Sequence, residues 1–167
     1  MTDARLSKAV DAAGGNPPEW FARADGPEAG VGLRFGCTMC GHCCSGPAGY
    51  VLVNDEECAA LAARLGLELQ AFIDRYTHVL PEGRSLREHT GPRGYDCVFL
   101  DREKFPGRAV CGVYEDRPRQ CRTWPFWNSV LENAGAWAKA GAMCPGINKG
   151  TLVPVEQVRV MRGVVDI

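Results

Sequence analysis

The sequence lacks the apolar segments that take a chain into or through a membrane. Its first residues carry charges at Asp3, Arg5 and Lys8, so no apolar stretch of about 7–15 residues is available for a secretory signal. No later run approaches the roughly 18–20 consecutive apolar residues that a membrane-spanning helix needs. We therefore expect a cytoplasmic protein without membrane contact.

An excess of basic residues is also missing. The 167 residues include 19 Lys and Arg against 20 Asp and Glu, which gives a net charge of −1. Proteins that bind nucleic acid neutralise many phosphates with basic side chains, so nucleic acid is not expected as a partner.

Recognisable catalytic motifs are a third absence. No Ser/His/Asp set, glycine-rich phosphate loop or pair of catalytic carboxylates can be named in the sequence. An enzyme is thus one alternative without an assigned substrate. In that alternative, a reactive thiol such as Cys44 would lie beside a metal with an open coordination position.

The length fits a single globular domain, which we place at residues 31–167. Residues 1–30 are interrupted repeatedly by Gly and Pro, and this composition predicts a flexible N-terminal arm. Trp20 and Phe21 are expected to anchor the arm to the domain.

Cysteine, by contrast, is abundant, with nine residues. The cytosol keeps thiols reduced, and an odd count leaves one cysteine without a partner, so a disulfide scaffold is disfavoured. Metal binding becomes the leading interpretation.

The strongest motif is the run from Cys37 to Cys44, which has the spacing C-x2-C-x2-C-C. A tight turn can aim thiolates with this spacing at one centre, and Gly36 and Gly41 provide the backbone freedom for it. Bacterial ferredoxins use C-x2-C-x2-C to give three thiolates to one [4Fe-4S] cluster, whereas zinc sites more often use separated C-x2-C pairs.

Cys43 and Cys44 are neighbours in this run. If the segment is extended, their side chains point to opposite faces and would rarely chelate one ion together, which predicts that they divide between two centres. The alternative is that one of them is a packed thiol. Cys58 is excluded as a ligand, because its spacing with Leu61 and Leu65 places it on the apolar face of a helix.

The predicted elements indicate an α+β class: a small, irregular, metal-stabilised domain with a helical hairpin, short strands and a short C-terminal helix. The hairpin joins helices over 55–65 and 68–77, with Asn54 or Asp55 as the first N-cap and Gly66 as its stop. A strand is expected at 50–53 before the hairpin.

Predictions for the second half are less regular. Residues 81–96 are turn-rich, and short strands are expected at 98–100 and 110–114. The stretch 126–142 predicts a hairpin, although its alanines also suit a helix. Pro154 opens the C-terminal helix.

Basic and aromatic residues surround Cys121. We expect Arg117, Arg122 and Trp124 to be cofactor-binding residues, since arginines can offset the charge of about −2 on a four-thiolate centre and an aromatic ring excludes water. An alternative pairs the two arginines with the neighbouring Glu115 and Asp116 and leaves Trp124 in the core.

These motifs together resemble the CxxCxxCC cysteine-cluster family, whose members are described as zinc- or iron-chelating or iron-sulfur proteins. Beside the first run, the resemblance rests on Cys97-Val98-Phe99-Leu100, on the stretch from Cys111 to Phe126, and on Cys144-Pro145-Gly146. It implies a metal-binding set of eight cysteines: Cys37, Cys40, Cys43, Cys44, Cys97, Cys111, Cys121 and Cys144.

From this resemblance and the ferredoxin-like spacing we expect an iron-sulfur cluster, of the 4Fe-4S type, that serves electron transfer or the handling of clusters and metal ions with a protein partner. The alternative is a zinc-binding structural or interaction module with one or two four-cysteine sites.

Overall fold

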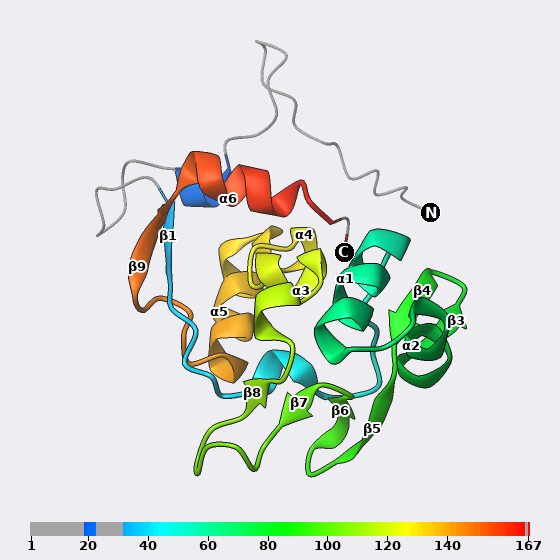
Figure 1. Ribbon diagram of the computed structural model, residues 1–167. Helices are drawn as coiled ribbons and strands as arrows, with labels where there is room; N and C mark the ends of the chain where they lie inside the picture. The colour runs from blue at the N-terminus through cyan, green and yellow to red at the C-terminus, as the bar shows by residue number, and fades with distance from the viewer. Residues whose placement is uncertain (1–18, 23–31, 166) are drawn as a thin grey trace, which may run out of the picture.

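The fold is described from a computed structural model for residues 19–22, 32–165 and 167. Except for 19–22, the predicted arm over 1–30 lies outside these described residues. The domain combines short helices with short antiparallel strands, so the predicted α+β class is confirmed (Figure 1). None of the helices in the described part is long and apolar enough to cross a membrane.

The elements follow in chain order. The first half contains η1 (Trp20–Ala22), β1 (Gly32–Phe35), η2 (His42–Cys44), β2 (Ser45–Gly46), α1 (Asp55–Leu65), α2 (Leu69–Tyr76), β3 (Thr77–Leu80) and β4 (Gly83–Leu86). The second half contains β5 (Glu88–Gly91), β6 (Gly94–Cys97), β7 (Leu100–Asp101), β8 (Val110–Cys111), η3 (Tyr114–Asp116), α3 (Arg119–Thr123), α4 (Asn128–Leu131), α5 (Ala134–Met143), β9 (Thr151–Pro154) and α6 (Val155–Arg162).

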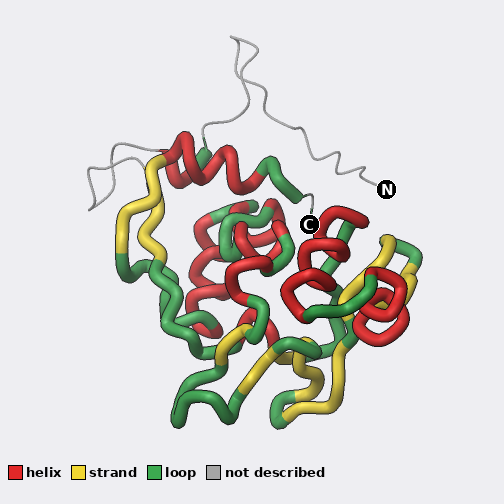
Figure 2. The backbone as a smooth tube through the Cα atoms, in the orientation of Figure 1, coloured by secondary structure: helices red, strands yellow, loops and turns green. Residues whose placement is uncertain are grey.

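Buried apolar side chains form two clusters. The central core comes from one continuous stretch of chain: Val53, Cys58, Leu61, Ala62, Phe72, Leu86, Phe99 and Val113. The terminal core joins both ends of the domain: Phe21, Leu33, Phe126, Leu131, Trp137, Ala140, Cys144, Ile147, Val155 and Val158. In Figure 2, the helices α3 to α6 lie on one side of the molecule and α1 and α2 on the other.

The two helices predicted at 55–65 and 68–77 are confirmed as α1 and α2, which form a hairpin beside the central core. Asn54 caps α1 by accepting from the backbone N–H of Glu57, whose carboxylate accepts in return from the Asn54 N–H. Gly66 ends the helix in the left-handed conformation, with φ of 65°. Cys58 is fully buried on the core face, as its spacing predicts.

The strand predictions were less accurate. The stretch 50–53 makes only an isolated bridge from Leu52 to Ser85, and the turn-rich segment 81–96 holds most of β4 to β6. Strands β7 and β8 pair as expected but are only two residues long each. Two tight hairpins explain why the strands β4 to β6 were not predicted. Their two-residue turns, at 81–82 and 92–93, gave the whole segment the composition of a turn.

The hairpin predicted for 126–142 was wrong, and the helical alternative holds. Asn133 caps α5 by accepting from the N–H of Ala136. Strand β1 pairs antiparallel with β9, and α6 packs beside them. Phe21 is buried in the terminal core, so this part of the N-terminal segment is anchored as predicted.

Candidate metal centre

The cysteine run forms a loop between the two cores. Gly41, with φ of 70°, precedes η2, and a Cβ atom there would lie 2.5 Å from that of Ala109. The Ala109 N–H donates to the Met39 carbonyl at 3.0 Å, which ties the loop to the segment just before β8. The structure therefore confirms that Gly41 is required at this turn, both because its φ is positive and because a Cβ atom would not fit.

Cys43 and Cys44 lie in η2 rather than in an extended segment. Their Sγ atoms are 3.7 Å apart, so the expectation that they point to opposite faces was wrong. A 3₁₀ turn rotates neighbouring side chains by about 120°, less than the alternation of a strand, and this lets both sulfurs face the same space.

Cys97 and Cys111 are brought in by short antiparallel strands. Ser45, which follows Cys44, pairs with Asp96, which precedes Cys97. Leu100 pairs with Cys111 in the β7–β8 ribbon. Strand register thus connects three separate parts of the chain that carry cysteine.

A buried ion pair fixes the first of these pairings. Asp96 is 2% exposed, and its two carboxylate oxygens accept from Arg102 at 2.7 and 2.9 Å. The same guanidinium donates to the Ser45 hydroxyl at 3.0 Å. These charge-assisted bonds hold the pKa of Asp96 down at about 2 and clamp the backbone beside Cys44 and Cys97.

Cys121 lies in the short helix α3. Its neighbour Gln120 is buried and accepts from the Leu52 N–H while donating to the Tyr50 carbonyl, at 2.8 and 2.9 Å. This amide clip holds α3 against the chain that leaves the cysteine run.

Six of the eight predicted cysteines line one cavity of about 380 Å³, which we call the cysteine cavity. They are Cys37, Cys43, Cys44, Cys97, Cys111 and Cys121. Phe35 and Trp124, which pack on the terminal core, line it together with Leu86 and Phe99 of the central core. The cavity therefore lies at the junction of the two cores.

The three predicted cofactor-binding residues also line this cavity. Arg117 stacks on the ring of Tyr114 at 3.8 Å, and Arg122 donates to the Arg117 carbonyl at 2.6 Å. The alternative that pairs these arginines with neighbouring acids is not seen, because Asp116 instead pairs with Arg64. Trp124 has a buried indole N–H without a hydrogen-bond partner among the described residues.

The sequence model of the CxxCxxCC family, described as a "putative zinc- or iron-chelating domain", matches residues 36–145. The chain belongs to this family. The match spans the cysteine run, the strands and helix that surround the cysteine cavity, and Cys144. No solved structure matches the chain.

Two cysteines of the predicted set in this CxxCxxCC domain do not line the cavity. Cys144, which directly follows α5, is 7% exposed in the terminal core, and Cys40 is half-buried. Cys144 is linked to the run indirectly, because the ring of His42 contacts the carbonyl of Met143. Within the described residues, no three His, Cys, Asp or Glu side chains meet closely enough to hold an ion as they stand.

Burial and mutual proximity shift the thiol pKa values in the cysteine cavity. The pKa of Cys43 falls to about 7, because the Cys44 thiol donates to its sulfur and Arg117 adds a smaller effect; the pKa of Cys44 rises in return. Burial raises the pKa of Cys97 to about 11 and also raises that of Cys121. A metal must therefore displace protons from several of these thiols.

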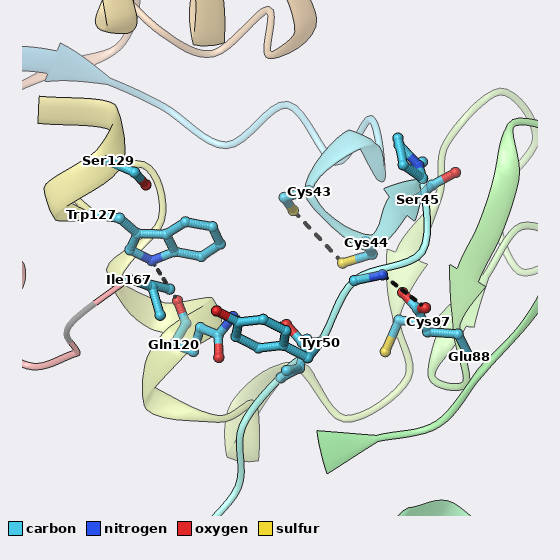
Figure 3. A pocket seen from close by; sticks show the side chains of 14 residues that line it. Cys43, Cys44, Ser45, Tyr50, Glu88, Cys97, Gln120, Trp127, Ser129 and Ile167 are labelled. Atoms are coloured by element: carbon cyan, nitrogen blue, oxygen red, sulfur yellow. Dashed lines mark hydrogen bonds between the residues drawn. The ribbon is translucent and has the colours of Figure 1, made fainter. Parts of the chain in front are cut away.

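A second cavity, of about 460 Å³, is also lined by Cys43, Cys44 and Cys97, and we call it the Glu88 cavity. Figure 3 shows the two neighbouring cysteines across the cavity from Trp127 and Tyr50.

The sequence interpretation missed four polar residues at the site: Glu88, Asp96, Arg102 and Gln120. Two of them, Asp96 and Gln120, directly precede a predicted ligand, which was an available signal. Asp96 pairs with Arg102 six positions along the chain, whereas the partners of Glu88 and Gln120 lie 39 and 68 positions away and could not be read from spacing.

Proposed function

We propose that this metal-binding protein holds an iron-sulfur cluster in the cysteine cavity and serves electron transfer or the handling of clusters and metal ions. The observation that carries the proposal is the convergence of six cysteines on one cavity of about 380 Å³. A single zinc ion is saturated by four thiolates that enclose it directly, whereas a cluster occupies space of its own between its ligands.

The charge of the lining supports the same conclusion. Lys104, Arg117 and Arg122 line the cavity, and none of the described residues that line it is Asp or Glu. Four thiolates on an oxidised [4Fe-4S] cluster leave a net charge of about −2, which these cations would offset. The cluster would supply one-electron chemistry, and the apolar walls would exclude water from it.

The ligand set remains the predicted eight cysteines, of which those lining the cavity are the leading candidates. Cys40 and Cys144 would be ligands of a second, less complete centre or structural thiols. Cys58 stays outside the set, since it is enclosed by Leu61 and Phe72 in the central core.

A second candidate is zinc, and one distance favours it. Four sulfurs at about 2.3 Å from a zinc ion lie about 3.8 Å from one another in a tetrahedron. The Cys43 and Cys44 sulfurs are 3.7 Å apart and would fit as two corners. In this case the protein would be a structural or interaction module.

Metal analysis separates the two candidates. The protein is purified without oxygen, its visible spectrum is recorded, and iron, acid-labile sulfide and zinc are counted per chain. We expect a coloured protein with equal iron and sulfide; a colourless, iron-free protein loaded with zinc would contradict the cluster.

A pair of variants tests the ligand set. Cys40→Ser is expected to abolish metal loading at one centre, whereas Cys58→Ser is expected to leave loading intact. Loss of metal in Cys58→Ser, with the fold retained by circular dichroism, would show that the exclusion of Cys58 is wrong.

A further inference from the structure

A wall of three cysteines is shared by two cavities whose lining residues carry opposite charge. Cys43, Cys44 and Cys97 line both the cysteine cavity and the Glu88 cavity. Among the described residues, three basic side chains and no acidic one line the first. The described residues that line the second include one acidic side chain, Glu88, and no Lys, Arg or His. A positive ion that approaches the wall is repelled on one side and attracted on the other.

Glu88 is placed to act directly at the wall. It lies opposite Cys97 in the β5–β6 register, so the two side chains share a face of the sheet. One of its carboxylate oxygens accepts from the Gly49 N–H at 3.1 Å, and no ion pair involves Glu88 within the described part of the chain. Among the described residues, therefore, no cation is paired with its negative charge.

The far wall of the Glu88 cavity is held in place. The Trp127 indole N–H donates to the Gln120 carbonyl at 3.0 Å and lies 3.2 Å from the Thr123 hydroxyl oxygen. Gln120 in turn holds the backbone of Tyr50. These hydrogen bonds hold the elements around the cavity in place. The cavity volume of about 460 Å³ admits a hydrated ion.

We propose that the Glu88 cavity is the port through which divalent metal cations reach Cys43, Cys44 and Cys97, and that Glu88 attracts and first contacts them. The inference rests on the proposed function, because it requires that these cysteines bind metal. Carboxylate oxygen is a hard ligand and thiolate a soft one, so a soft or borderline ion passes from Glu88 to the sulfurs. Each thiol that binds releases its proton to solvent, and no electron transfer is needed.

The test measures how fast metal-free protein takes up Cd²⁺ in the absence of oxygen, from the ultraviolet absorption of the cadmium-thiolate bonds after rapid mixing. Glu88→Gln removes the charge and keeps an oxygen that can accept from Gly49. Glu88→Lys reverses the charge. Glu82→Gln is the matched control, since Glu82 is exposed in the β3–β4 turn and lines neither cavity.

We expect uptake to slow about threefold to tenfold in Glu88→Gln and further in Glu88→Lys, with an unchanged rate in Glu82→Gln. The final number of Cd²⁺ ions per chain should be unchanged in Glu88→Gln. Added salt should slow the unsubstituted protein more than Glu88→Gln, because the charge that salt screens has been removed.

Three results would overturn the port. Equal rates in Glu88→Gln and the unsubstituted protein would show that Glu88 does not attract the ion. Equal slowing in Glu82→Gln would show an effect of net charge alone. Faster uptake in Lys104→Gln without slowing in Glu88→Gln would place entry at the cysteine cavity. If the unsubstituted protein takes up no Cd²⁺ at all, the proposed metal site fails, and the port fails with it.

Discussion

The two cores are built in different ways. The central core gathers residues from one continuous stretch, 51–113, whereas the terminal core joins residues 20–35 to residues 124–161. Contacts between distant segments form only after a long loop has closed, and closing it costs entropy that local contacts do not pay. The difference gives the position of the cysteines a consequence. A metal bound at the junction would cross-link the central core, which forms from local contacts, to the terminal core, which depends on distant ones.

The largest expected effect comes from removing the metal. We expect the free energy of unfolding to fall by about 5 kcal/mol or more, because metal bound only by the folded chain stabilises it. Hydrogen exchange should then accelerate more in α5 of the terminal core than in α1 of the central core. Equal acceleration in both helices would show that the cores form one cooperative unit.

Core truncations come next. Phe72→Ala in the central core and Phe126→Ala in the terminal core should each cost about 3–5 kcal/mol, since both rings are at most 2% exposed. Urea unfolding measures both. The sum of the single effects should match the double variant within about 0.5 kcal/mol if the cores are independent, and a larger deviation would reveal coupling through the junction.

A smaller effect is expected at the clamp on the central side of the junction. Asp96→Asn should cost about 2 kcal/mol at pH 7, because the pKa of Asp96 falls from 3.8 to about 2 on folding. A lowered pKa gives stability that is complete above pH 3.8 and is lost as the pH falls through 2. The difference between Asp96→Asn and the unsubstituted protein should therefore shrink from pH 4 to pH 2, and a constant difference would contradict this origin.

The smallest effects should come from the helix caps, one beside each core. Asn54→Ala and Asn133→Ala should each lower the melting temperature by the equivalent of about 1 kcal/mol. Asn54→Ala should cost more, since it also breaks the reciprocal bond with Glu57, while Asn133 has no such partner among the described contacts. A larger loss in Asn133→Ala would show that α5 depends more on local capping than on its packing.

Local chemistry made much of the central core predictable. The apolar spacing around Cys58, the cap at Asn54 and the stop at Gly66 lie within one helix and its ends, so the sequence alone predicted α1 and its buried face. The short strands β4 to β6 were missed because each has only four residues, one of them glycine, and pairing with a neighbour rather than propensity makes them strands.

The sequence alone was enough to identify the cysteine run and the family, because the spacing of ligands in a tight turn can be read from consecutive residues. Tertiary structure alone decided that Cys144 lies in the terminal core and that Glu88 and Gln120 support the site. Each of these depends on contacts between residues far apart in the chain. Spacing along a sequence fixes which side chains are near one another in a turn, but only packing fixes which turns meet.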